Sequence, residues 1–125
     1  MNNPSTPLAL AATWQGALFD GDWIAAADTL EVIEPGSGQP LYSVGKAGPA
    51  EVGAAVAKAR AAQRAWAATP PRERAAVFHR AAAILQEQAA AAAALIARET
   101  GGILAKGEHE VREAIVLLQR AAAMP

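Results

Sequence analysis

Three neighbouring residues, Glu108, His109 and Glu110, offer two carboxylates and an imidazole, which are side-chain types that bind metal ions. Adjacent residues of a helix point to different sides, however, and helices that supply two metal ligands place them four positions apart. The triplet therefore favours a solvated helix start over a metal site.

The segment Gly36-Ser37-Gly38 has the glycine content of a phosphate-binding loop. A dinucleotide fingerprint also needs a third glycine and a helix directly after the loop. Here an extended segment follows, at residues 41–44. We interpret these glycines as turn residues.

The remaining charged groups also have simple explanations. His79 has no cysteine or second histidine at helical spacing, which favours a surface or partly packed imidazole. The cluster Arg72-Glu73-Arg74 could bind an anion, but it is more typical of ion pairs at a helix end. The chain has no cysteine, so it offers neither a thiolate nucleophile nor a disulfide. The residues alone indicate no self-sufficient catalytic site.

The composition predicts a small core. Alanine accounts for 35 of the 125 residues, and Leu, Ile, Val and Phe together make up about 20% of the chain. A buried Leu or Ile side chain contributes roughly 1.5–3 kcal/mol, far more than an alanine methyl group. We therefore expect apolar faces that pack against something else.

Charge and hydropathy argue against several kinds of partner. The net charge of −1 favours neither nucleic acid nor an acidic membrane surface. Residues 1–7 lack the features of a signal peptide, and the apolar run at 89–97 is too short to span a bilayer. We expect a cytoplasmic protein that binds neither nucleic acid nor membrane.

The N-terminal part of the chain is expected to be extended. Residues 1–13 are predicted to form a flexible arm. Asp20-Gly21 is a favoured hairpin pair, and Pro35 ends a strand because proline cannot donate to a sheet. The predicted strands lie within residues 17–24, 29–33 and 41–44.

From residue 49 onward the pattern is that of alanine-rich helices. Pro49 and Glu51 suit the first turn of a helix. Lys58, Arg60 and Arg64 are predicted to lie largely off its apolar stripe. That stripe comprises Val52, Ala55, Val56, Ala59, Ala62 and Trp66.

The later helices are delimited by capping signals. Thr69 is the predicted N-cap of the next helix, with Pro70 at its first position. This helix continues to Arg98, either straight or with a bend, and Gly101 provides a left-handed C-cap. The last helix begins near Leu104 or Lys106. The expected inward residues are Phe78, Ala81, Ala82 and Leu85, then Leu104, Val111, Ile115, Leu118 and Ala122.

Several collinear pieces of the chain resemble the start of aldehyde dehydrogenases. Phe19-Asp-Gly-Asp-Trp23 resembles the opening hairpin of that family, and Glu34–Pro40 is similar to its Asn-Pro-Ala-Thr-Gly-Glu turn. Further pieces follow in the family's order, at 55–59, Trp66, 72–74, 99–101 and Glu110-Val111. Finer detail is similar to benzaldehyde and vanillin dehydrogenases, at Trp14–Gly16, Ala62-Gln63, 99–103 and Lys106.

The resemblance implies an NAD(P)-dependent oxidation of a small-molecule aldehyde, aromatic in this branch, to a carboxylic acid. It also implies an α/β fold, in which residues 14–125 form the incomplete N-terminal part of a Rossmann-like cofactor-binding domain. Taken alone, the chain would be a β-hairpin lead-in followed by about four alanine-rich helices. The family's catalytic cysteine and glutamate, its oxyanion-hole asparagine and its cofactor-binding residues fall beyond residue 125. No catalytic or cofactor-binding residue is therefore assigned.

The resemblance further implies a homo-dimer or homo-tetramer for the parent enzyme, with NAD or NADP bound there and none on this chain. Some members hold a monovalent cation with backbone near Ile33 and an acid at the position of Glu110, which makes these two the candidate metal ligands. We expect a fragment that is inactive alone. The alternative is a small helical interaction or regulatory module derived from such a fragment.

Overall fold

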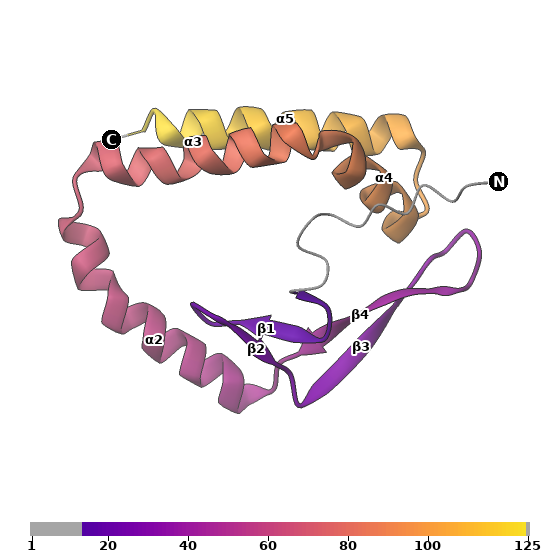
Figure 1. Ribbon diagram of the computed structural model, residues 1–125, viewed down its shortest axis with the longest axis horizontal. Helices are drawn as coiled ribbons and strands as arrows, with labels where there is room; N and C mark the ends of the chain where they lie inside the picture. The colour runs from indigo at the N-terminus through magenta and orange to yellow at the C-terminus, as the bar shows by residue number, and fades with distance from the viewer. Residues whose placement is uncertain (1–13, 125) are drawn as a thin grey trace. The chain divides into compact units, whose positions relative to one another are not determined.

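The computed structural model describes residues 14–124, so the predicted arm at residues 1–13 lies outside the described part (Figure 1). The chain divides into two compact units, an N-terminal unit (Met1–Ala67) and a C-terminal unit (Ala68–Pro125). Short paired strands are followed by four helices, which confirms the expected lead-in and helices. The elements are β1 (Ala17–Phe19), β2 (Trp23–Ala25), β3 (Asp28–Ile33), β4 (Pro40–Lys46), α2 (Pro49–Ala68), α3 (Pro71–Glu87), α4 (Ala89–Thr100) and α5 (Leu104–Ala122).

The first hairpin forms at the predicted Asp20-Gly21 turn. Strands β1 and β2 pair antiparallel, with Phe19 opposite Trp23 and their ring centroids 5.1 Å apart. Gly21 has a φ of 114°, a conformation that side chains with a Cβ rarely adopt. The backbone N–H of Asp22 donates to Asp20 Oδ1 at 3.4 Å. A glycine is therefore needed where the chain reverses.

The second hairpin joins β3 to β4 through the Gly36–Gly38 turn. The strands pair antiparallel from Asp28 opposite Lys46 to Ile33 opposite Pro40. The backbone N–H of Gly38 donates to the Glu34 carbonyl at 2.8 Å, and Gly38 has a φ of 69°. These glycines are turn residues, as the sequence predicted.

A close approach links the two hairpins. A Cβ atom at Gly45 of β4 would lie 2.4 Å from the Ala17 carbonyl oxygen of β1, so only glycine fits there. Gln15 forms an isolated antiparallel bridge with Val44, and Trp14 meets Tyr42 edge to face at 4.7 Å. Two small sheets are thereby held together.

Helix α2 begins with the predicted Pro49 and Glu51. The Glu51 carboxylate accepts a hydrogen bond at 3.0 Å from the backbone N–H of Gly48, which satisfies a free donor at the helix start. Lys58 Nζ lies 2.6 Å from Asp20 Oδ2 and connects α2 to the β1–β2 turn. No residue of α2 is buried.

Helix α3 begins one residue later than predicted. Pro70, and not Thr69, is the N-cap, and Pro71 takes the first helical position. The reason is steric: a residue followed by proline is pushed out of the helical region, and Pro70 has φ −53° and ψ 141°. Arg74 Nη1 donates to the Thr69 carbonyl at 2.6 Å and ties the preceding loop to the helix.

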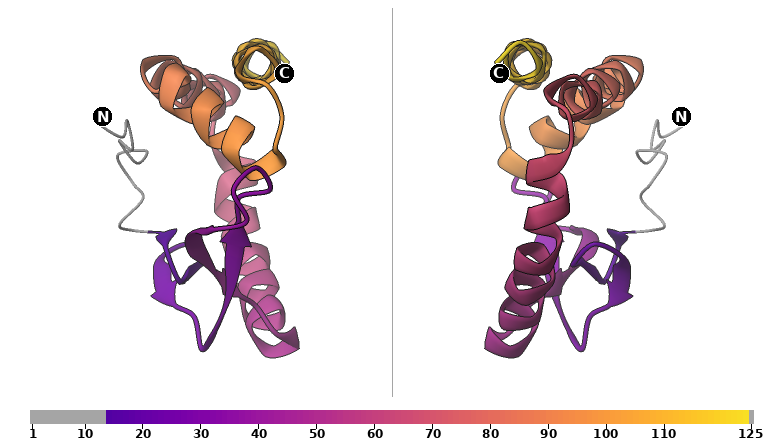
Figure 2. Two further views of the ribbon diagram at one scale, coloured as in Figure 1. Left: turned by 90° about the vertical axis from the view of Figure 1, so that its right-hand side faces the viewer. Right: turned by 90° about the vertical axis from the view of Figure 1, so that its left-hand side faces the viewer.

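The bend in the alanine run is present. Helix α3 ends at Glu87, Gln88 has φ −103° and ψ 14°, and α4 starts at Ala89. Gly101 has a φ of 69° and ends α4 in the predicted left-handed conformation. Helix α5 then packs against both α3 and α4 (Figures 1 and 2).

The buried residues of the described chain all belong to the C-terminal unit. A Cβ atom at Gly107 would lie 2.3 Å from the Ala93 carbonyl oxygen, so α4 and α5 meet almost backbone to backbone. The larger buried side chains of α5 are the predicted Val111 and Ile115. The buried residues are Ala82, Ala92, Ala93, Gly107, Val111 and Ile115.

Two predictions of inward side chains were wrong. Leu104 is 52% exposed, because it is the first residue of α5 and precedes the crossing at Gly107 by nearly one turn. Phe78 is 36% exposed, whereas Ala82 of the same helix is buried and Leu85 half-buried. The inward face of α3 is thus set by its alanines.

Candidate functional site

The acidic triplet of α5 is solvated, as predicted. Glu108, His109 and Glu110 are all exposed. Lys106 Nζ donates to the Glu110 carboxylate one turn away. Within residues 14–124, no group of three His, Cys, Asp or Glu side chains is placed to hold a metal ion.

The two candidate ligands of a monovalent cation belong to different units. Ile33 is the last residue of β3 and pairs with Pro40 in the N-terminal unit. Glu110 lies in the C-terminal unit, and its carboxylate accepts a hydrogen bond from the Lys106 ammonium. Neither unit contains both residues, and the cation site stays a prediction.

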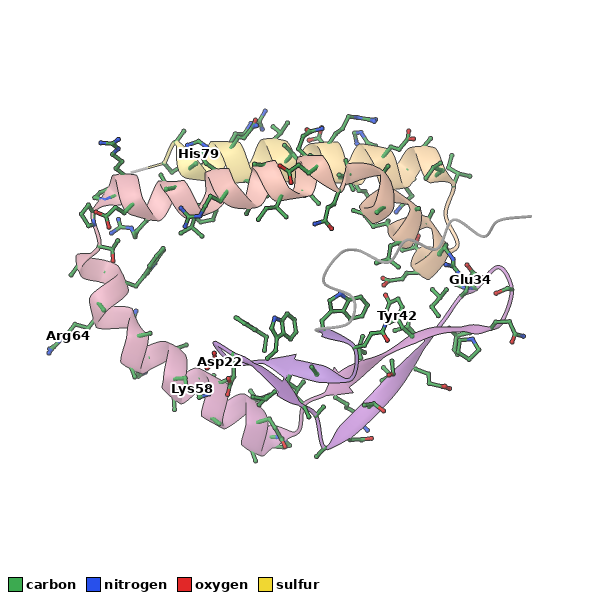
Figure 3. All side chains as sticks on the ribbon, viewed as in Figure 1. Asp22, Glu34, Tyr42, Lys58, Arg64 and His79 are labelled. Atoms are coloured by element: carbon green, nitrogen blue, oxygen red, sulfur yellow. The ribbon has the colours of Figure 1, made fainter. Side chains whose placement is uncertain are left out.

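The isolated imidazole and the arginine cluster both belong to α3. His79 is exposed on α3 (Figure 3). Arg72 and Glu73 are exposed in the first turn of α3, while Arg74 is half-buried and donates to the Thr69 carbonyl. Arg72, Glu73 and Arg74 therefore form the first turn of α3.

The carboxylate of Asp20, in the N-terminal unit, is fixed by an ion pair. The Asp20 side chain is 11% exposed and receives the Lys58 ammonium at 2.6 Å. The hydrogen bond from Lys58 lowers the pKa of Asp20 below its ordinary value, against the opposing effect of burial. Sequence analysis gave Asp20 only a turn role and missed this pair, because its partner lies in a distant segment.

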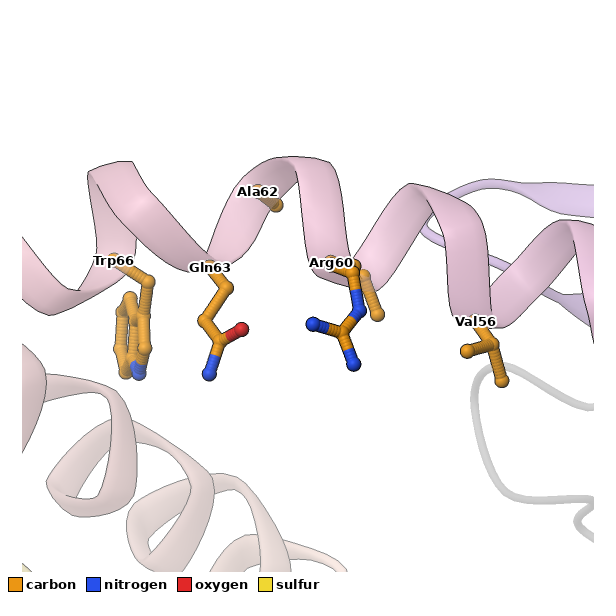
Figure 4. Close-up of a pocket in the computed structure, with 6 residues that line it drawn as sticks. Val56, Arg60, Ala62, Gln63 and Trp66 are labelled. Atoms are coloured by element: carbon orange, nitrogen blue, oxygen red, sulfur yellow. The ribbon is translucent and has the colours of Figure 1, made fainter.

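A further candidate surface is one side of α2, which we call the α2 face. The side chains of Val56, Arg60, Gln63 and Trp66 project from the same side of the helix (Figure 4). Val56 is 60% exposed and Trp66 47% exposed. The α2 face is an open hollow lined by Val56, Ala59, Arg60, Ala62, Gln63 and Trp66.

The α2 face overlaps the predicted stripe but differs from it in charge. Every residue from Val56 to Ala68 is exposed. Arg60 was placed largely off the stripe, although it follows Val56 by four positions and so shares its side of the helix. Tryptophan and arginine beside small apolar residues are typical of protein interfaces.

The profile of the aldehyde dehydrogenase family matches residues 23–125. Together with the fold, this match defines the class: the chain belongs to the aldehyde dehydrogenase family.

Two of the similar enzymes are dehydrogenases of aromatic aldehydes. The chain is 44% identical over 113 residues to the vanillin dehydrogenase of an Amycolatopsis species, covering 90% of this chain and 23% of that enzyme. It is 37% identical over 112 residues to a benzaldehyde dehydrogenase (NAD+) of Pseudomonas putida, covering 89% and 23%.

Solved structures agree with the sequence relatives. An NAD-dependent benzaldehyde dehydrogenase of Corynebacterium glutamicum superposes with a TM-score of 0.81 at 29% identity, over 94% of this chain and 26% of that one. A succinate-semialdehyde dehydrogenase of Burkholderia pseudomallei gives 0.83 at 30% identity, over 98% and 25%.

The chain therefore spans about a quarter of the length of its relatives and aligns with their N-terminal part. This confirms the resemblance that the sequence motifs suggested. Among residues 14–124, none of the helices has the length and apolar character needed to cross a bilayer.

Proposed function

We propose that this chain supplies the N-terminal part of the cofactor-binding domain of an NAD(P)-dependent dehydrogenase that oxidises aromatic aldehydes to carboxylic acids, and that it is inactive alone. The observation that carries the proposal is the 44% identity to a vanillin dehydrogenase over 90% of the chain. The second sequence relative, a benzaldehyde dehydrogenase, supports the same substrate class.

The role of these residues in that enzyme is structural. A thiolate nucleophile must come from another segment, because the chain has no cysteine. The Gly36–Gly38 turn joins two antiparallel strands and so lacks the helix N-terminus that binds a dinucleotide pyrophosphate. This turn thus does not fit the cofactor, and we propose no step of hydride transfer for residues 14–124.

A chimeric enzyme tests the proposal. This chain would replace the matching 113 residues of the Amycolatopsis vanillin dehydrogenase. Nicotinamide reduction is then followed with vanillin, benzaldehyde and, as a comparison, succinate semialdehyde. We expect kcat/KM for the two aromatic aldehydes within about tenfold of the parent enzyme, which equals a loss of up to about 1.4 kcal/mol. A chimera that folds and binds cofactor but oxidises none of the three would refute the proposal.

Ile33 and Glu110 stay our proposed ligands for a monovalent cation in the assembled enzyme. Crystals of the chimera grown with thallium should show an anomalous peak that contacts both residues. A refined structure with no such peak would remove the site.

A second candidate function is a helical interaction module. It is favoured by the buried core of the C-terminal unit, which consists of residues of α3, α4 and α5. A sharp thermal transition of the isolated chain, independent of its concentration, would favour this module. Aggregation or a molten state would favour the enzyme part.

A further inference from the structure

We infer that the α2 face is a docking surface for the part of an aldehyde dehydrogenase polypeptide that this chain lacks, and that this partner presents an apolar surface with a carboxylate opposite Arg60. The inference rests on the proposed function and adds the surface and the chemistry of its partner.

Val56 and Arg60 of the α2 face lie on the side of the helix away from the first hairpin. Lys58, which pairs with Asp20 in the first hairpin, lies roughly 200° around the helix from Val56. The hairpin therefore lies on the side of α2 opposite Val56 and Arg60, whereas Ala62 follows Lys58 by four positions and lies at the edge nearest the hairpin. The side with Val56 and Trp66 has no strand of the N-terminal unit against it, which agrees with the exposure of both side chains.

The composition of the α2 face suits a polypeptide partner. Trp66 offers a large rigid side chain, and Ala59 and Ala62 allow a neighbouring backbone to come close. Tryptophan and arginine contribute most of the binding free energy in many interfaces. A hollow that is open along a single helix fits an element of secondary structure better than it fits a small ligand.

The charges of α2 indicate which charged group the partner carries at the edge of the contact. Helix α2 carries Lys58, Arg60 and Arg64 but only one acid, Glu51. Lys58 is paired with Asp20, whereas Arg60 makes no ion pair with any residue between 14 and 124. A guanidinium that becomes covered needs an acceptor, and a carboxylate is the strongest one available.

The length of the relatives indicates which polypeptide covers the α2 face. The chain covers 23% of the vanillin dehydrogenase and 26% of the solved benzaldehyde dehydrogenase, so about three quarters of each enzyme lies outside the match. A second copy of this chain is a poorer occupant. A symmetric contact would place the same patch on both sides and bring Arg60 towards its own copy.

The test is complementation by two separate chains. The 125-residue chain is produced together with the Amycolatopsis vanillin dehydrogenase that lacks its matching 113 residues, and the complex is measured by light scattering and by titration. Val56→Asp should weaken the complex by about tenfold or more, because it buries a charge without a partner. Ala61→Asp, on the exposed opposite side of α2, is the matched control and should change affinity by less than about threefold.

Charge reversal tests the rim independently. Arg60→Glu should weaken the complex by about tenfold, since it sets two carboxylates against each other. Ala61→Glu places a carboxylate on the exposed opposite side of the same helix and should have an effect of less than about threefold.

The outcomes separate the docking surface from the enzymatic role. Absence of a complex, equal effects of face and control variants, or dimers of this chain formed through the α2 face would each overturn the docking inference. A complex that depends on the α2 face but oxidises no aldehyde would uphold docking and refute the proposed function. If the truncated partner does not fold, the chimera takes its place: Val56→Asp should lower its melting temperature and Ala61→Asp should not.

Discussion

The two units of this chain bury side chains in opposite ways. The N-terminal unit has all three tryptophans, yet none of its residues from 14 to 67 is buried. The C-terminal unit has no tryptophan and buries three alanines, a glycine, Val111 and Ile115. Burial in this chain therefore follows the closeness of the elements and not the size of the side chains.

The physical cause is the contact between backbones. At the Gly107–Ala93 crossing, α4 and α5 are so close that small residues fill the space between them. In the N-terminal unit, two-stranded sheets and one helix leave large side chains such as Phe19 and Trp66 half-exposed or more. Two-stranded sheets are marginal alone, so this unit depends more on an added partner.

The largest difference in stability between the units is expected when one glycine of each unit is replaced by alanine. Gly107→Ala places a Cβ atom 2.3 Å from a backbone oxygen, so α4 and α5 must separate, at a cost of about 1–3 kcal/mol. Gly53→Ala in α2 meets nothing within 4 Å and should stabilise its helix by about 0.5–1 kcal/mol. Urea unfolding followed by circular dichroism gives both values. Equal effects would show that the crossing is not tight.

A smaller difference in stability between the units is expected when one isoleucine of each unit is replaced by alanine. Ile115→Ala removes a side chain that is 7% exposed and should destabilise the C-terminal unit by about 2–4 kcal/mol. Ile24→Ala removes one that is 39% exposed in β2 and should cost less than about 1 kcal/mol. Chemical denaturation of both variants measures the difference. A larger loss at Ile24 would mean that the strands, and not the helices, contain the main core.

The difference between the two units also explains which structural features could be predicted from the sequence. Signals that act within a few residues were reliable: Asp20-Gly21 and Gly101 each end an element where predicted. The start of α3 was misplaced by one residue, because two consecutive prolines offer two possible first positions. The family was recognisable because its motifs are collinear.

Features that depend on tertiary packing could not be predicted. The periodicity of α5 placed Val111 and Ile115 correctly, but it could not show that the crossing occurs at Gly107 and leaves Leu104 exposed. The stripe of α2 was found, whereas its exposure depends on which elements cover it. The pair of Asp20 and Lys58 joins segments that no local signal connects.

That pair gives the smallest expected effect, and it is confined to the N-terminal unit. Lys58 keeps the pKa of Asp20 below its ordinary value of 3.8, so as the pH falls the unfolded chain takes up a proton before the folded chain does. The stability that this pair contributes is thus present at neutral pH and is lost as the pH falls below 3.8 towards the folded value. Lys58 is half-exposed, which keeps the contribution small.

Tryptophan fluorescence isolates this effect, because Trp14, Trp23 and Trp66 all lie in the N-terminal unit. Asp20→Asn should lower the urea midpoint of the fluorescence change at neutral pH and should flatten its dependence on acid. Asp22→Asn removes a neighbouring carboxylate that makes no ion pair with any described residue, and it should leave both unchanged. If both variants shift the midpoint equally, Lys58 does not hold the hairpin to α2, and the position of the hairpin on the side of the helix opposite Val56 must have another cause.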